Sequence, residues 1–149
     1  MEINEINGAD KKSVTEGLPF LLYACAKATQ TVYADELADC GLTFTQYLVM
    51  SELWRKEMLT LKELGKNLHL DSGTLSPLCQ KLGNNGLVER RRCKPDERNL
   101  RLSLTAKGKA LREKAGEAAE RAGTAFQGFR PELSPIFDEL GRLLKDLEE

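Results

Sequence analysis

The sequence has little of what metal centres and enzyme active sites are made from. Its 149 residues include one histidine, His69, and four cysteines, Cys25, Cys40, Cys79 and Cys93, none of them in a CxxC pair. A zinc site therefore lacks ligands at the usual spacing, and no nucleophile with a base, metal cluster or phosphate-binding loop is visible. We expect no metal, no cofactor and no enzymatic activity.

Long apolar stretches are also missing. No run of residues has the length and apolar character of a membrane span, and residues 1–12 are acidic and polar, unlike a signal peptide. With 149 residues, 41% of them hydrophobic and 30% charged, the chain fits a single globular domain. We expect a cytoplasmic protein without a membrane partner.

Net charge is nearly absent, because 22 basic and 23 acidic residues leave −1. That balance weakly opposes non-specific binding of nucleic acid, but the charges are unevenly placed. From Lys81 to Lys109 there are nine basic and three acidic residues, a local balance of +6. A basic segment inside a neutral chain is typical of a nucleic-acid reader, although such a run taken alone is more often a solvated surface.

An apolar stripe with helical spacing predicts a helix that begins at Asp71 or Ser72. The stripe consists of Leu75, Leu78, Cys79 and Leu82. The opposite face carries short or hydrogen-bonding side chains, which let a helix approach a flat partner and read its donors and acceptors. These are Ser72, Thr74, Ser76, Gln80 and Lys81. Pro77 predicts a bend or a short helix, unless it is tolerated in the second turn, and Gly86 is available for a left-handed cap.

Two short arms after Gly86 predict a β-hairpin. The second arm, over residues 99–104, alternates apolar and polar side chains, which is the period of a strand. Between the arms, Lys94, Pro95 and Asp96 have the chemistry of a turn. A helix with a polar reading face followed by a basic hairpin describes a winged helix-turn-helix.

These segments resemble the MarR family of bacterial transcription regulators, and most closely its organic-hydroperoxide-sensing branch. The resemblance covers roughly residues 18–115 in order and spacing, and it is carried by residues 42–47, 70–78, 86–88, 96–98 and 103–105. It implies a mainly α fold with a small β-hairpin. Dimerisation helices over residues 17–40 and 105–149 would flank a winged helix-turn-helix DNA-binding region over residues 43–104.

The resemblance implies a sequence-specific regulator, most simply a repressor, that binds a near-palindromic double-stranded DNA operator as a homodimer. The residues expected near DNA on the reading helix are Asp71, Ser72, Thr74, Ser76, Pro77, Gln80 and Lys81. Gln80 can pair with adenine, and Lys81 with guanine or phosphate. The alternative is a winged-helix protein-interaction module that has lost DNA binding.

The hairpin has separate expected roles under the same resemblance. Arg98 would enter the minor groove, where a narrow A·T-rich stretch attracts arginine, and Asp96 would hold the tip through an ion pair. The remaining basic side chains would position phosphates and not read sequence. They are Arg90, Arg91, Arg92, Lys94 and Arg101.

The segments around this region predict helices that need a partner. Residues 18–37 carry apolar side chains on two helix faces, and a second subunit is the natural cover for both. A long helix is predicted from Thr105 through Leu111 and Ala115, and a last helix over about residues 134–147. The apolar stripe of that last helix is Ile136, Phe137, Leu140, Leu143 and Leu144. Residues 43–46 and 60–63 have the capping-box pattern that begins further helices.

The resemblance fails at the sensing site. In the hydroperoxide-sensing branch a reactive cysteine lies near the start of the first helix, and Pro19 occupies that place here. Tyr23 and Tyr33 match the two tyrosines that surround the cysteine in the branch. We therefore expect that the usual route of hydroperoxide sensing is not used. A small apolar or aromatic effector, in a pocket bordered by Tyr23, Tyr33 and Tyr47, is slightly favoured.

Oxidation of another thiol is the alternative signal, and Cys25 is the cysteine nearest that pocket in sequence. The simpler expectation for Cys25 is a small buried apolar residue. Cys79 lies on the apolar stripe of the reading helix and is expected in the core. Cys40, at a helix end, and Cys93, in the hairpin, are expected to be more exposed and so more available for oxidation.

Overall fold

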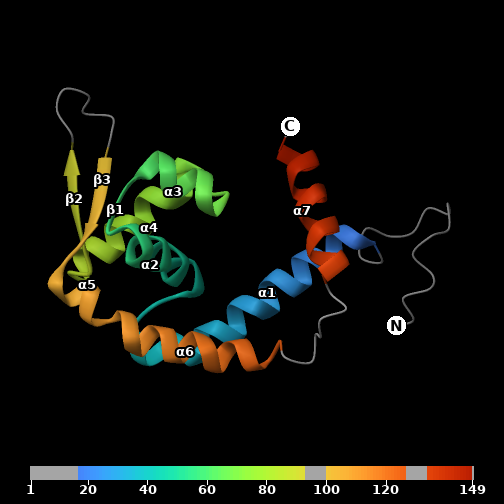
Figure 1. The fold of residues 1–149 in the computed structure, drawn as a ribbon, viewed down its shortest axis with the longest axis horizontal. Helices are drawn as coiled ribbons and strands as arrows, with labels where there is room; N and C mark the ends of the chain where they lie inside the picture. The colour runs from blue at the N-terminus through green and yellow to red at the C-terminus, as the bar shows by residue number, and fades with distance from the viewer. Residues whose placement is uncertain (1–16, 93–99, 127–133, 149) are drawn as a thin grey trace.

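The computed structural model describes residues 17–92, 100–126 and 134–148, which form helices and one small sheet at one side of the molecule (Figure 1). The helices are α1 (Leu18–Leu37), the 3-10 turn η3 (Ala38–Cys40), α2 (Phe44–Lys56), α3 (Leu61–Leu68), α4 (Ser72–Asn84), α5 (Ala106–Ala110), α6 (Arg112–Thr124) and α7 (Ser134–Glu148). The strands are β1 (Met58–Thr60), β2 (Val88–Arg92) and β3 (Leu100–Leu104). None of the helices in these ranges is long and apolar enough to cross a membrane.

The predicted hairpin is present, and a third strand joins it. β3 pairs antiparallel with both β2 and β1, so the strand order is β1-β3-β2. Leu59 of β1 lies opposite Leu102 of β3, and both are buried. The sequence did not predict β1, because three residues are too short for an alternating pattern to stand out. The predicted turn at residues 94–96 lies outside the described residues.

Helices α2 and α3 begin at the two capping boxes that the sequence predicts. The backbone N–H of Thr43 donates to the Gln46 side-chain oxygen at 2.9 Å, and Gln46 N–H donates back to the Thr43 hydroxyl at 3.3 Å. Thr60 and Glu63 repeat this exchange at the start of α3. Hydrogen bonds from the backbone and side chain of Thr60 lower the pKa of Glu63. The two capping boxes are thus confirmed.

The core lies where α2, α3 and α4 meet the sheet. Its fully buried side chains from these elements are Val49, Met50, Leu53, Leu64, Leu75, Cys79, Leu82 and Leu102. The stripe predicted for the reading helix therefore faces inward, with Leu78 only half-buried. α4 runs uninterrupted with Pro77 inside it, so the proline is tolerated. Gly86, with φ of +71°, has the left-handed conformation expected after the helix.

After the sheet, the chain continues into α5 and α6, and α6 runs beside α1 (Figure 1). Arg121 Nε lies 2.7 Å from a carboxylate oxygen of Glu36. The single long helix predicted from Thr105 is wrong in one respect, because α5 ends at Ala110 and α6 begins at Arg112. The Leu111 N–H donates to the Lys107 carbonyl at 3.1 Å and the Ala115 N–H to the Leu111 carbonyl at 3.0 Å, so the interruption is confined to Leu111.

Candidate nucleic-acid interface

The predicted reading face of α4 is open to solvent. All seven side chains expected near DNA on this helix are exposed, and they are Asp71, Ser72, Thr74, Ser76, Pro77, Gln80 and Lys81. The opposite face is anchored in the core by Leu75, Cys79 and Leu82. The sequence thus folds into a helix that presents only short or hydrogen-bonding groups outward.

Asp71 caps the N-terminus of α4. One of its carboxylate oxygens accepts from the backbone N–H of Thr74 at 2.9 Å, and the other accepts from the Thr74 hydroxyl at 2.8 Å. These two bonds lower the pKa of Asp71, so the residue stays ionised as an N-cap. The Thr74 hydroxyl proton is committed to Asp71, so the exposed hydroxyl can offer a partner only its acceptor lone pairs.

The basic residues of β2 do not all point the same way. Arg91 and Arg92 are exposed, and Arg91 Nη2 lies 2.9 Å from a carboxylate oxygen of Glu89. Arg90 is half-buried and donates a hydrogen bond to the side-chain oxygen of Gln80 on α4. The expected wing-tip residues Lys94, Asp96 and Arg98 lie outside the described residues.

The structure places the expected pocket residues in two separate groups. The rings of Tyr33 and Tyr47 have centroids 6.3 Å apart, and Phe44 lies 4.5 Å from Tyr33. Tyr23 is ten residues before Tyr33 on α1, about 15 Å along the helix, and its ring is 6.3 Å from that of Phe20. The single described chain therefore does not bring the three tyrosines together, and the pocket expected between them stays a prediction.

Pro19 and Cys25 lie on the exposed surface of α1. Pro19 is in the first turn, where its missing N–H removes no helical hydrogen bond. Cys25 is exposed, which corrects the simpler expectation that it is buried. The N-terminal part of α1 extends away from the winged region toward α7 (Figure 1), and Leu18 shares a surface depression with α7 residues.

The other two described cysteines differ in access. Cys79 is buried as expected, and burial raises the pKa of its thiol to about 11, so it stays protonated at neutral pH. Cys40 is half-buried, less open than expected, and it lines a surface cavity together with Lys107 and Lys114. Cys93 lies outside the described residues.

Comparison with known proteins gives the family. A family model described as "Transcriptional regulator SarA/Rot" matches residues 31–115. The HTH-type transcriptional regulator TtmR of Methylorubrum extorquens is 46% identical over 138 residues, covering 93% of this chain and 71% of that protein. The chain belongs to the MarR family of transcriptional regulators. The family and these relatives are regulators of transcription, not enzymes.

Other members of the MarR family are similar in sequence and in fold. The organic hydroperoxide resistance transcriptional regulator of Bacillus subtilis is 40% identical over 109 residues, covering 73% of this chain and 74% of that protein. Reduced AbfR bound to DNA superposes with a TM-score of 0.79 at 33% identity, covering 89% of this chain and 92% of that chain. AbfR is a protein of Staphylococcus epidermidis.

Two lysines that the sequence analysis missed border the reading face of this MarR-family chain. Lys62 and Lys66 are exposed, and with Ser72 and Ser76 they line a groove between α3 and α4. In a helix-turn-helix the helix before the reading helix crosses the DNA backbone. The available signal was two lysines four residues apart on α3, the first of them inside the capping box of Thr60 and Glu63.

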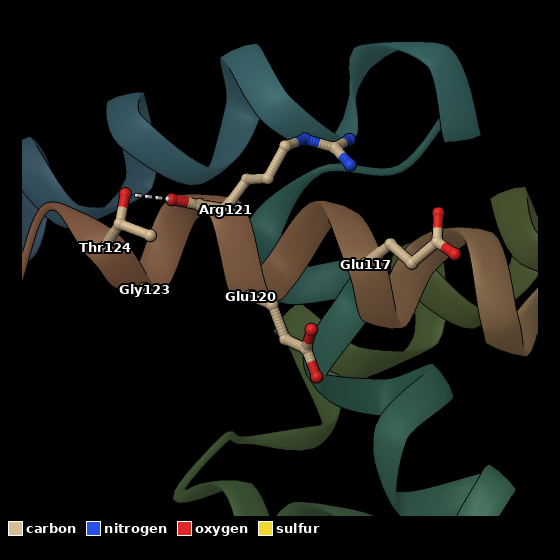
Figure 2. Close-up of a pocket in the computed structure, with 5 residues that line it drawn as sticks. All are labelled: Glu117, Glu120, Arg121, Gly123 and Thr124. Carbon is tan, nitrogen blue, oxygen red and sulfur yellow. Dashed lines mark hydrogen bonds between the residues drawn. The ribbon is translucent and has the colours of Figure 1, made fainter.

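A second depression, on α6, has a structural explanation. It is lined by Glu117, Glu120, Arg121, Gly123 and Thr124. Figure 2 shows Arg121 reaching from α6 toward α1, while Thr124 donates to the Arg121 carbonyl at 2.7 Å. All five residues come from α6, and Arg121 joins this helix to α1 through its ion pair with Glu36.

Proposed function

We propose that this MarR-family chain is a sequence-specific DNA-binding regulator, most simply a repressor, whose α4 enters the major groove of an operator. The observation that supports this best is the exposed polar face of α4, opposite the buried side chains of Leu75, Cys79 and Leu82. The basic residues of β2 and α3 would hold the flanking phosphates. Expected contacts are Asp71, Ser72, Thr74, Ser76, Pro77, Gln80, Lys81, Arg90, Arg92, Lys94, Asp96 and Arg98.

The DNA-bound structures of AbfR support this reading over a protein-interaction module that has lost DNA binding. A short-side-chain helix face beside basic strands fits a charged, grooved partner better than a protein surface. A regulator of this kind acts where the DNA is, so we place the protein in the cytoplasm.

We propose that the active form is a homodimer. Exposed apolar side chains gather at the start of α1 and along α7, including Leu21 at 39%, Ile136 at 50% and Phe137 at 73% exposure. Residues 17–40 and 105–149 would pair two copies, and residues 43–104 would carry the two reading helices. Two-fold symmetry then calls for a near-palindromic operator with half-sites about 10 base pairs apart.

A gel shift with the DNA upstream of the protein's own gene tests the proposed function. We expect a discrete complex that survives an excess of scrambled duplex of equal length. Absence of any complex would favour the interaction module instead, and equal competition by the scrambled duplex would contradict sequence-specific binding.

Substituting Lys66 by alanine should lower the salt dependence of operator binding. Each lost phosphate contact reduces the slope of log K against log salt concentration by about 1, so a dimer should lose that amount once per subunit. Base preference should not change. Binding titrations over a salt series measure the slope, and Lys145→Ala, an exposed lysine on α7, is the control that should leave it unaltered.

The signal that releases DNA stays open between two routes. AbfR has been solved in reduced, overoxidised and disulfide forms, whereas BpsR of Bordetella bronchiseptica is described as regulated by 6-hydroxynicotinic acid. BpsR is only 22% identical to this chain. We propose a small apolar or aromatic effector near Tyr33 and Tyr47, whose rings form an aromatic cluster with Phe44.

Cumene hydroperoxide should therefore not release DNA from the wild type or from Cys25→Ser. A thiol reacts as the thiolate, which a neighbouring cation favours, and the nearest basic residue in sequence, Lys27, has its ammonium 5.8 Å from the Tyr23 ring centroid. Fluorescence anisotropy of a labelled operator measures the response. If the wild type releases DNA on oxidation and Cys25→Ser does not, Cys25 is the sensor. If the wild type and Cys25→Ser both release DNA and Cys40→Ser does not, the sensor is Cys40.

A further inference from the structure

Gln80 lies in the middle of a chain of side-chain hydrogen bonds on the exposed face of α4. The guanidinium of Arg90, on β2, donates to the side-chain oxygen of Gln80. The side-chain nitrogen of Gln80 donates in turn to the side-chain oxygen of Asn84, one turn further along α4, at 2.9 Å. Three residues from two elements form one directed relay, from Arg90 through Gln80 to Asn84.

The chemistry of arginine fixes the direction of this relay. A guanidinium has donors only, so the Gln80 atom that faces Arg90 must be the oxygen. The Gln80 nitrogen must then face Asn84, and the Asn84 atom that receives its proton must also be an oxygen. Amide orientations are assigned from their hydrogen-bond partners, and here one charged side chain determines two of them.

Arg90 is held against α4. Its side chain is half-buried, and its Nε is buried without a hydrogen-bond partner in the part of the chain that the structure describes. Its stem lies over Gly83, where an added β-carbon would be 3.4 Å from Arg90 Cδ. The next residues, Arg91 and Arg92, are both exposed. Arg90 is therefore the member of this basic run that is directed at the reading helix.

The relay decides which groups this end of α4 offers to a partner. The Gln80 oxygen is covered by a cation, so the groups left facing outward are chiefly donors: a Gln80 N–H, the Asn84 N–H groups and the Lys81 ammonium. In the major groove guanine presents two acceptors, N7 and O6, whereas adenine presents an acceptor beside a donor. A bidentate glutamine–adenine pair needs the Gln80 oxygen, and the Arg90 hydrogen bond competes for it.

We propose that Arg90 is a specificity-determining positioning residue, which acts through Gln80 and Asn84 to make this end of α4 read guanine instead of adenine. The inference rests on the proposed function, because it requires α4 to enter a major groove. It replaces the phosphate contact expected for Arg90 and the adenine contact expected for Gln80.

Selection of bound sequences from a library of randomised DNA duplexes, with the full-length protein at one salt concentration, tests the proposal. The wild type should enrich a site with one guanine in each half that is preferred over adenine by about tenfold. Arg90→Met keeps an apolar stem and removes the donors, so this preference should fall to about twofold or less. Arg91→Met, the matched loss of one charge from the same strand, should weaken binding to all sequences and keep the preference.

Gln80→Glu gives a second readout that does not depend on how well the Arg90 variant folds. The glutamate keeps the bond from Arg90 and replaces the outward donor by an acceptor, so the preferred base should change from guanine to cytosine, whose amino group donates. Equal preferences in Arg90→Met and Arg91→Met, or guanine still selected by Gln80→Glu, would overturn this inference alone. A wild type that enriches no sequence would overturn the proposed function together with it.

Discussion

Replacing Leu140 and Leu144 together by glutamate should convert the protein into a monomer and weaken operator binding by about 100-fold or more. The two leucines are 39% and 42% exposed in the single chain, although they lie on the apolar stripe of α7. Carboxylates in a dimer interface would have to be stripped of water without a partner, which is strongly unfavourable. Sedimentation velocity at micromolar concentration and titration of a labelled operator measure the two effects.

The large expected loss of DNA binding comes from the coupling of two half-sites. A dimer that has bound one half-site holds its second reading helix next to the other, which raises the effective concentration of that helix. A monomer loses this advantage with its reading surface intact. Lys145→Glu is the control. It changes the charge of α7 more than a single leucine-to-glutamate substitution does, but it lies at an exposed polar position, so the protein should remain a dimer. A double variant that remains dimeric would remove α7 from the interface.

The features that could be predicted from the sequence are those with short-range causes. The Thr43–Gln46 exchange and the cap from Asp71 to Thr74 each join residues three apart, so spacing and side-chain type suffice to find them. The stripe on α4 was equally visible, because the periodicity of a helix is contained in the residues of the helix. The exposed reading face followed from the same periodicity.

The features that the sequence analysis missed depend on residues far apart in the chain. β1 exists because Leu59 meets Leu102 across the sheet, and no local pattern marks three residues as a strand. Gln80 and Arg90 meet only when β2 folds back beside α4. The adenine contact expected for Gln80 therefore did not take into account the competing hydrogen bond from Arg90. Cys25 was expected to be buried because a free cysteine commonly behaves as a small apolar residue, but the described chain supplies no cover at that point.

Gly108→Ala should destabilise the protein by about 3 kcal/mol or more, lowering its melting temperature by roughly 10 °C. Gly108 is buried in α5, and a β-carbon there would lie 2.0 Å from the carbonyl oxygen of Leu87 and 3.3 Å from Leu104 Cδ2. No side-chain rotation relieves a collision with backbone, so α5 must move away from the sheet. Thermal unfolding followed by circular dichroism measures the loss.

That movement should also affect DNA binding, because Gly108 lies at the junction between the winged region and the helices proposed to form the dimer. The Trp54 indole donates to the Gly108 carbonyl at 2.8 Å, and the Gly108 N–H donates to the Thr105 hydroxyl at 3.0 Å. Displacing α5 breaks the Trp54 contact, while the cap from Thr105 moves with the helix. It also changes the angle between the two parts, and with it the spacing of two reading helices. Operator affinity should therefore fall even at temperatures where the variant stays folded.

Gly116→Ala is the matched control for this substitution. Gly116 lies inside α6, and a β-carbon there meets nothing within 4 Å among the described residues. Alanine is the better helix former, so this variant should gain about 0.5–1 kcal/mol of stability. The same chemical change thus has opposite expected signs at two glycines, and the difference depends only on what lies beside each α-carbon. Equal melting temperatures for the two variants would mean that α5 does not pack against Leu87 as described.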